Sequence, residues 1–374
     1  MSERSGAHAA PAPAPRLTEW LRAALAPEPC PAGMTSREIV KRSVEYRDPP
    51  RIPYAFIEPL RSDFFETAEL DRQRRALGRG KADEGGGYRA AGEVYTDEWG
   101  VRRQATGGYF DRVIEHPLAA LKGLDDYPLA EVADPRRFEW LAPHLRAAHD
   151  AGKYVVAADP VLLYERLREL LGFESLLLAP LSEREAFEGL LDRLTDLSVA
   201  AIEAYAQLGN ADAFMTWQDF GIQTGLPMRI ESFREIYAPR LARIADAAHA
   251  GGMHFIWHCC GHIVDLIPEM IEIGVDVLQL DQPRLLGHDR LAEAWGGKLC
   301  FWNTLDIQWA AGGVAEEALR KEVAAMTHPF AQLGGGLMVR HYPFPRDVEL
   351  SPEFHAASSR AFFASGCTQP RPCR

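Results

Sequence analysis

The fold is decided by the stretch from Ala211 to Gly261, which reads ADAFMTWQDFG (211–221), SFREIYAPRLARIADAAHAGG (232–252) and MHFIWHCCG (253–261). A short apolar run is followed by a long segment with helical spacing of apolar residues, and then by a second short apolar run. Strands that are apolar on both faces are typical of parallel sheets covered by helices. The stretch therefore predicts a strand, a helix and a second, parallel strand.

The same alternation recurs along the chain. A strand is expected at KYVVAAD (153–159), and a helix at PVLLYERLRELLG (160–172). Further alternating runs are HIVDLIPEMIEIG (262–274), VDVLQLDQ (275–282), KLCFWNTLDI (298–307), VAEEALRKEVAAMTHPFAQLGG (314–335), GLMVRHYPF (336–344) and SPEFHAASSRAFFASG (351–366). No G-x-G-x-x-G or phosphate-loop motif opens any of these units, which disfavours the nucleotide-binding α/β folds. We predict an α/β fold, a single (β/α)8 TIM barrel with an N-terminal extension.

Composition and charge narrow the function classes. The chain has 374 residues and a formal net charge of −12, and it has no basic run, which argues against nucleic-acid partners and membrane surfaces. Its six cysteines show no disulfide-framework spacing, which is typical of a reducing compartment. No segment resembles a secretory signal or a membrane span. We expect a cytoplasmic protein that acts on a small molecule.

Three segments are expected to lie outside the regular barrel. Residues 1–33 are rich in Ala and Pro and predict a mobile extension with one short helix near Leu17 to Leu25, and residues 367–374 predict a frayed tail. The barrel is expected to span residues 34–366. The Gly-rich piece at 72–93 reads as a long surface excursion. Whether its part near residues 78–92 closes over a substrate stays open.

Polar residues gather at the ends of the predicted strands, where a TIM barrel carries its functional groups. Six strand ends share this habit. The residues are Asp159; Trp217, Gln218 and Asp219; His258, Cys259 and Cys260; Gln279, Asp281 and Gln282; Asn303 and Asp306; Arg340 and His341.

Several segments together resemble the uroporphyrinogen decarboxylase-like superfamily, from about Met34 to Gly366. They are MTSREIVKRSVEYRDPPRIPYAF (34–56), TDEWGVRRQATGGYFDRVIEHPLAAL (96–121), WQDFGIQTGLPMRIESFREIYAPRLARIADAAHAGG (217–252), WHCCG (257–261), IPEMIEIGVDVLQLDQP (267–283) and RHYPFPRDVELSPE (340–353). The resemblance implies a single (β/α)8 barrel. It also implies one of two chemistries, because the superfamily contains decarboxylases and cobalamin-dependent methyltransferases.

The methyltransferase branch fits the residues better. True uroporphyrinogen decarboxylases carry an early R-Q-A-G-R segment for a substrate with many carboxylates, whereas residues 57–65 here read IEPLRSDFF. The other branch includes methylcobamide:coenzyme M methyltransferases and the methyltransferase components of O-demethylases. In its thiol-methylating members an H-x-C pair and a later cysteine hold zinc.

The resemblance implies a set of site residues. His258 and Cys260 stand at the H-x-C positions, and His341 stands where the later cysteine is expected. We predict a zinc site of His258, Cys260 and His341, with Asp219, His258 and His341 as catalytic residues. Cys259 should face the opposite way and pack as a core thiol. The residues expected to contact substrate are Trp217, Gln223, Gln282, Asn303, Asp306 and Arg340.

The predicted function is a zinc-assisted, corrinoid-dependent methyltransferase that moves a methyl group between a small O-, N- or S-methyl compound, or a thiol, and cobalamin. The cobalamin is expected free or on a separate corrinoid protein, and a homodimer is left open. One alternative is a metal-free decarboxylase for another carboxylated substrate, with Arg340 pairing to the carboxylate. The other is a non-catalytic ligand-binding barrel, because a fold alone does not establish activity.

Overall fold

The structure is a computed structural model that describes residues 17–76 and 89–367. Its main sheet runs in the order β2-β1-β12-β11-β10-β9-β8-β7-β3. Eight of these nine strands form the wall of a nearly closed parallel barrel, and β2 (Leu60–Ser62) pairs antiparallel to β1. The eight are β1 (Tyr54–Ile57), β3 (Phe64–Glu66), β7 (Tyr154–Ala158), β8 (Ala213–Trp217), β9 (His254–His258), β10 (Val277–Leu280), β11 (Cys300–Asn303) and β12 (Leu337–Arg340). The predicted α/β barrel is confirmed.

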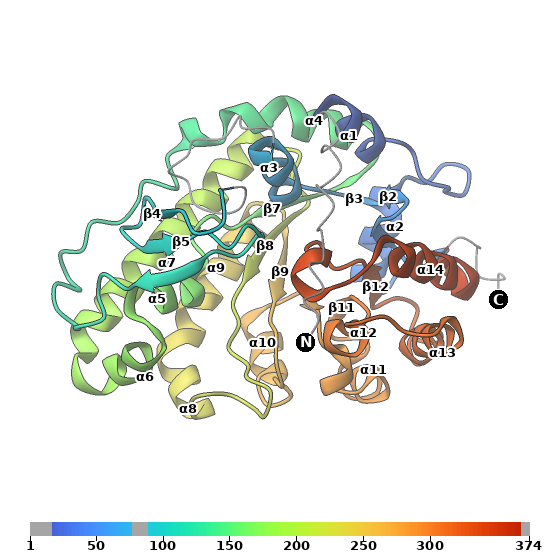
Figure 1. Ribbon diagram of the computed structural model, residues 1–374. Coiled ribbons are helices and arrows are strands. Elements are labelled where there is room, and N and C mark those ends of the chain that lie inside the picture. The colour runs from blue at the N-terminus through green and yellow to red at the C-terminus, as the bar shows by residue number, and fades with distance from the viewer. Residues whose placement is uncertain (1–16, 77–88, 368–374) are drawn as a thin grey trace, which may run out of the picture.

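Helices cover the outside of the barrel (Figure 1). Those that follow strands β3 to β12 are α3 (Thr67–Ala76), α4 (Ala142–Asp150), α5 (Leu163–Leu171), α6 (Phe173–Ser182), α7 (Arg184–Leu208), α8 (Ile230–Ser232), α9 (Ala238–Ala250), α10 (Ile267–Ile273), α11 (His288–Trp295), α12 (Ile307–Ala310), α13 (Glu316–Thr327) and α14 (Pro352–Phe362). Short irregular turns are η1 (Pro135–Arg137), η2 (Glu139–Leu141), η3 (Phe233–Tyr237), η4 (Pro283–Leu285), η5 (Pro345–Val348) and η6 (Phe363–Cys367). Among the described residues, no helix combines the length and the apolar character that crossing a membrane requires.

The strands are apolar throughout because both of their faces are buried. In β7, Tyr154 and Val156 belong to the cluster that fills the barrel interior, whereas Val155 and Ala157 belong to the cluster between the barrel and the helices. Successive side chains of a strand point to opposite faces. In each of the other wall strands, this alternation likewise decides which side chains point into the lumen of the barrel and which point toward the helices.

The barrel closes through a seam that lacks a helix. Within residues 54–66, all described, β1 passes through β2 straight into β3. The Asp63 backbone N–H donates to Tyr54 O at 2.9 Å, and Asp63 O accepts from the Tyr154 N–H at 2.9 Å. The fully buried Asp63 carboxylate also accepts two hydrogen bonds from Arg51. A buried ion pair of this kind is strongly destabilising to break from one side.

The described part of the N-terminal extension packs on the barrel. Helix α1 (Leu17–Ala24) contacts β2 and α3, and its Trp20 is buried with its ring centroid 6.1 Å from that of Phe65. Farther along, Glu28 pairs with Arg61 at 2.7 Å. The expectation of a mobile extension therefore needs correction over residues 17–33, because Trp20 gains apolar burial against the barrel. Residues 1–16 and 368–374 lie outside the described residues.

A small antiparallel sheet of β4 (Val94–Thr96), β5 (Arg102–Gln104) and β6 (Arg112–Glu115) is inserted between α3 and α4. Asp97 anchors it: the carboxylate accepts from the Trp99 and Val101 N–H groups at 3.0 Å each and from Arg103 Nε at 2.7 Å. Arg103 also pairs with Glu169 of α5 at 2.8 Å. The TDEWG segment thus joins the sheet to the barrel. Most of the Gly-rich excursion, residues 77–88, lies outside the described residues.

Candidate metal site at the ends of β8 and β9

Three potential ligands converge where β8 and β9 end. His258 is the last residue of β9, Cys260 lies two residues later, and Asp219 lies two residues after the end of β8. One ligand atom from each lies within 4.8 Å of the others. His258 Nε2 is 3.5 Å from Cys260 Sγ and 3.4 Å from Asp219 Oδ1. Because β8 and β9 are parallel neighbours in register, Trp217 opposite His258, both loops leave the barrel at one level.

Two glycines bring these loops together. Gly221 and Gly261 approach so closely that a Cβ on Gly261 would lie 2.5 Å from the carbonyl carbon of Gly221, and a Cβ on Gly221 would lie 2.3 Å from Cys260 O. Gly261 also has a φ of +87°, which favours glycine. The contact lets Asp219 Oδ1 accept the Cys260 N–H at 2.8 Å. The carboxylate and the thiol therefore sit on one rigid junction.

A chain of hydrogen bonds holds the His258 ring on its Nδ1 side, opposite Cys260 and Asp219. Its Nδ1 bonds Gln279 Oε1, and Gln279 Nε2 donates to Asp281 Oδ1 at 2.8 Å. All three residues are buried, with exposed fractions of 6% or less. Nε2 of His258 is left to face Cys260 and Asp219.

The site is electronegative. Burial, followed by the charges of Asp219 and Asp281, raises the pKa of the Cys260 thiol far above its ordinary range. Burial and the charge of Asp219 also raise the pKa of Glu165 to about 7, and Glu165 accepts the Asp219 N–H at 3.3 Å. A cation would compensate this accumulation of acceptors and carboxylates.

The donor set fits a zinc ion. Zinc takes imidazole nitrogen, thiolate sulfur and carboxylate oxygen, and tetrahedral bonds of about 2.0–2.3 Å place nitrogen and sulfur roughly 3.5 Å apart and nitrogen and oxygen roughly 3.4 Å apart. The observed separations are 3.5 Å and 3.4 Å. Three protein ligands leave one position of a tetrahedral ion for another molecule, as in catalytic zinc sites.

The part of the chain that carries this site resembles a known protein family. Residues 164–302, which include Asp219, His258 and Cys260, match the family model of uroporphyrinogen decarboxylase (URO-D). This part of the chain is similar to uroporphyrinogen decarboxylases. This confirms the resemblance drawn from its sequence segments. No curated protein sequence matches the chain.

Solved structures were compared with the fold of this chain. A methyltransferase from Methanosarcina mazei is 14% identical with a TM-score of 0.63, over 89% of this chain and 99% of that chain. A D-allulose 3-epimerase from Methylomonas sp. is 12% identical with a TM-score of 0.40, over 63% and 84% of the two chains. A D-psicose 3-epimerase from Clostridium cellulolyticum H10 is 10% identical with a TM-score of 0.37, over 62% and 86%. At 14% identity, the first of these likenesses shows a shared fold.

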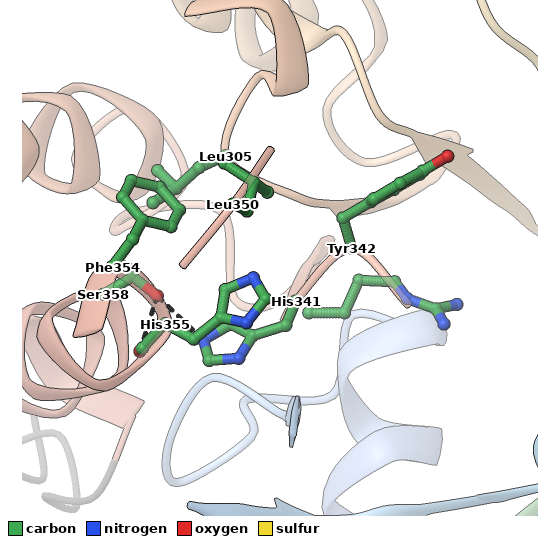
Figure 2. Close-up of a pocket in the computed structure, with 8 residues that line it drawn as sticks. Leu305, His341, Tyr342, Leu350, Phe354, His355 and Ser358 are labelled. Atoms are coloured by element: carbon green, nitrogen blue, oxygen red, sulfur yellow. Dashed lines mark hydrogen bonds between the residues drawn. The ribbon is translucent and has the colours of Figure 1, made fainter. Parts of the chain in front are cut away.

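His341 does not join the metal site, which corrects the predicted ligand set. Its Nδ1 accepts the Ile57 N–H at 3.3 Å, and its Nε2 bonds Ser358 Oγ at 2.8 Å. Figure 2 shows its ring against that of His355, with Tyr342 directed away from both; the two histidine ring centroids are 4.5 Å apart. The prediction is wrong because side chains alternate between the two faces of β12. Met338 faces the lumen and Val339 faces the helices, so Arg340 points into the lumen and His341 points toward the helices. The side chain that lies within 4.8 Å of the His258 and Cys260 ligand atoms is Asp219.

Of the other residues predicted to contact substrate, those on the strands point either into the lumen or toward the helices. Arg340 faces the lumen, with Nη2 3.2 Å from Glu66 and its guanidinium 4.5 Å above the Trp302 ring. Trp217 packs partly buried against the interior cluster. Asn303 is fully buried in register with Leu280 and Val339, which belong to the outer cluster, so it faces the helices. It therefore does not reach the lumenal site.

Three predicted contact residues have structural tasks in the loops. Asp306 caps α12 by accepting the Gln308 and Trp309 N–H groups at 3.0 Å each. Gln282 Oε1 accepts the Gly261 N–H at 3.0 Å, and exposed Gln223 donates to the same oxygen at 3.4 Å. Gln282 thus supports the turn that carries Cys260. Cys259 is fully buried in the outer cluster, as its parity predicts.

Proposed function

We propose that this chain is a corrinoid-dependent methyltransferase in which Asp219, His258 and Cys260 hold a zinc ion. The observation that carries the proposal is the convergence of these three donors at separations suited to zinc. When bound, zinc would act as a Lewis acid that keeps a substrate heteroatom anionic and nucleophilic. Cobalamin would supply or accept the methyl group.

The residues of the chain then have separate roles. Asp219 and Cys260 hold the ion with their charge, and His258 holds it through Nε2. Trp217 and Arg340 are the lumenal residues offered to the substrate; Arg340 Nε has no hydrogen-bond partner among the residues described. The name of the Methanosarcina mazei protein, a methyltransferase, supports this direction.

A carboxy-lyase is the second candidate, favoured by the family model that matches residues 164–302. The charges oppose a substrate with several carboxylates. Arg340 is already paired with Glu66, Arg168 with Glu165, and Arg103 with Asp97 and Glu169. Binding carboxylates would require breaking these pairs, and for the largely buried Arg340–Glu66 pair, with side chains 8% and 15% exposed, the cost is about 3–5 kcal/mol.

The test is metal content combined with methyl transfer. The full chain should purify with, or take up, one zinc per chain, and D219A, H258A and C260A should each lose it, whereas H341A should keep it. The wild-type chain should demethylate methylcobalamin in the presence of a panel of small thiols, followed by the corrin absorbance. Wild-type protein that takes up no zinc, or CO2 release from a carboxylated substrate by metal-free protein, would overturn the proposal.

A further inference from the structure

Asp281 lies outside the group of three ligands, yet it decides which nitrogen of His258 carries the hydrogen. An ionised aspartate can only accept hydrogen bonds. Gln279 must therefore turn its NH2 group toward Asp281 Oδ1, 2.8 Å away. Its carbonyl oxygen then faces His258 Nδ1. An amide oxygen can only accept, so His258 Nδ1 must carry the hydrogen.

We infer that Asp281 and Gln279 are positioning residues that hold His258 as the Nδ1–H tautomer and present the lone pair of Nε2 to Asp219 and Cys260. A neutral imidazole free in water favours the opposite tautomer, with the hydrogen on Nε2, where it would block a metal. The inference deepens the proposed function, on which its metal part rests. Its tautomer part does not depend on any metal.

We call the hydrogen-bond chain from Asp281 through Gln279 to His258 the relay. Because the relay is buried, it determines the tautomer of His258. Asp281, Gln279 and His258 are 6%, 2% and 6% exposed, so water is a poor competitor for any of their hydrogen bonds. Reversing the orientation of the Gln279 amide would leave Asp281 facing an amide oxygen, two buried acceptors in contact without a hydrogen between them, which is unfavourable. The donors and acceptors therefore have one arrangement: His258 Nδ1–H donates to Gln279 Oε1, and Gln279 Nε2 donates to Asp281.

The register of β9 and β10 places the side chains of His258, Gln279 and Asp281 next to one another. Gln279 pairs in register with His258 across β10 and β9, so the two side chains share the lumenal face. Asp281 lies two residues after Gln279 and points to the same side. His258 Nδ1 is 4.0 Å from Asp281 Oδ2, beyond hydrogen-bond distance. Asp281 therefore acts on the ring through Gln279.

The experiment exchanges the two polar groups. D281N replaces an obligate acceptor by a group that can also donate, which lets Gln279 take both orientations. Q279E/D281N again places an obligate acceptor beside His258 Nδ1 and keeps the total charge of the wild type. D306N is the matched control, because Asp306 is a similarly buried aspartate one strand away whose carboxylate caps α12 instead.

The first readout is the His258 tautomer in the metal-free full chain, from ¹⁵N shifts of histidine-labelled protein assigned by the signal missing in H258Q. Wild type, D306N and Q279E/D281N should show Nδ1–H, and D281N should populate Nε2–H. The second readout is zinc affinity by chelator competition, which should fall roughly 10–100-fold in D281N and recover in the double variant.

Two results would overturn the inference: an Nε2–H tautomer in the wild type, or a D281N chain that keeps only Nδ1–H. The first needs no variant, so it decides the matter even if D281N fails to fold. A chain with the expected tautomer that binds no zinc would instead sink the proposed function and leave the relay intact.

Discussion

His258 Nε2 and Asp219 Oδ1 lie 3.4 Å apart, and the relay through Gln279 leaves both of them as acceptors. Two acceptors that face each other lack a hydrogen between them, and a shared cation is the natural partner for both. His258 belongs to the hydrogen-bond chain in the lumen and Asp219 belongs to the loop after β8, so a cation held by both would link the two.

Replacing Asp219 by asparagine should remove a charged ligand while keeping an oxygen that can accept the Cys260 N–H. Zinc affinity should fall by more than the roughly 10–100-fold typical of outer-shell changes, with the melting temperature of the metal-free chain nearly unchanged. Chelator competition and thermal unfolding measure the two quantities. An affinity within about threefold of wild type would remove Asp219 from the ligand set.

Gly261→Ala should separate the two loops that carry the site. Both Gly252, which precedes β9, and Gly261, which follows it, have positive φ, but only Gly261 has backbone atoms within 3 Å of an added Cβ. G252A should cost the strain of an unfavourable φ, about 1–2 kcal/mol, and G261A should cost more and also lower zinc affinity. Urea unfolding of both variants is the measurement, and equal costs would contradict the close contact.

Acid should destabilise the contact between β12 and α14. Burial lowers the pKa of His355 from 6.5 to about 4, and burial, followed by the charges of His355 and Arg340, lowers the pKa of the stacked His341 well below its ordinary value. Both rings are neutral in the folded chain, so their contribution is complete above pH 6.5 and is lost as the pH falls through 4. His355 alone should cost about 2 kcal/mol between pH 7 and pH 5. Urea titrations at both pH values should show a smaller loss in H355Q than in the wild type.

Asp97→Ala should release the small inserted sheet. The buried carboxylate accepts two backbone hydrogen bonds and pairs with Arg103, whose side chain is 12% exposed. Its loss should cost about 3 kcal/mol or more. Glu98 pairs with Arg137 at a more exposed place, so E98A should cost no more than about 1 kcal/mol. Hydrogen exchange of β4 to β6 together with urea unfolding separates a local from a global effect.

The barrel and half of the site could be predicted from the sequence. Apolar runs separated by helical spacing predict six of the eight wall strands, β7 to β12, and miss β1 and β3. H-x-C at the end of MHFIWHCCG brings His258 and Cys260 to one point because both lie on the same face. Asp219 was recognised through family resemblance, and only as a catalytic residue. The loop contact that makes it a neighbour of Cys260 depends on Gly221 and Gly261, whose spacing in the sequence gives no sign of their meeting.

His341 and Gln279 mark where sequence reasoning failed. The resemblance places His341 at the position of the later cysteine, at the end of a strand, but Met338 faces the lumen, so Arg340 lies inside the barrel and His341 outside it. Gln279 stood among the polar residues of a strand end without a role. Its parity with Val277, and its register opposite His258, carry the signal that could have found it.

The pairing of β1 with β12 has a consequence for how the protein is made. Tyr54 of β1 pairs with Val339 of β12 and Ala55 with Arg340, and the Ile57 N–H bonds the His341 side chain, 284 positions farther along the chain; the described residues contain no strand after β12. On the ribosome, β1 can pair with β2 early, but its edge toward β12 must wait until β12 has left the exit tunnel, because contacts this distant in sequence form late and slowly. Packing of α1 against β2 and α3 can hold the β1–β2 pair in place meanwhile, because all of these segments lie within the first eighty residues synthesised.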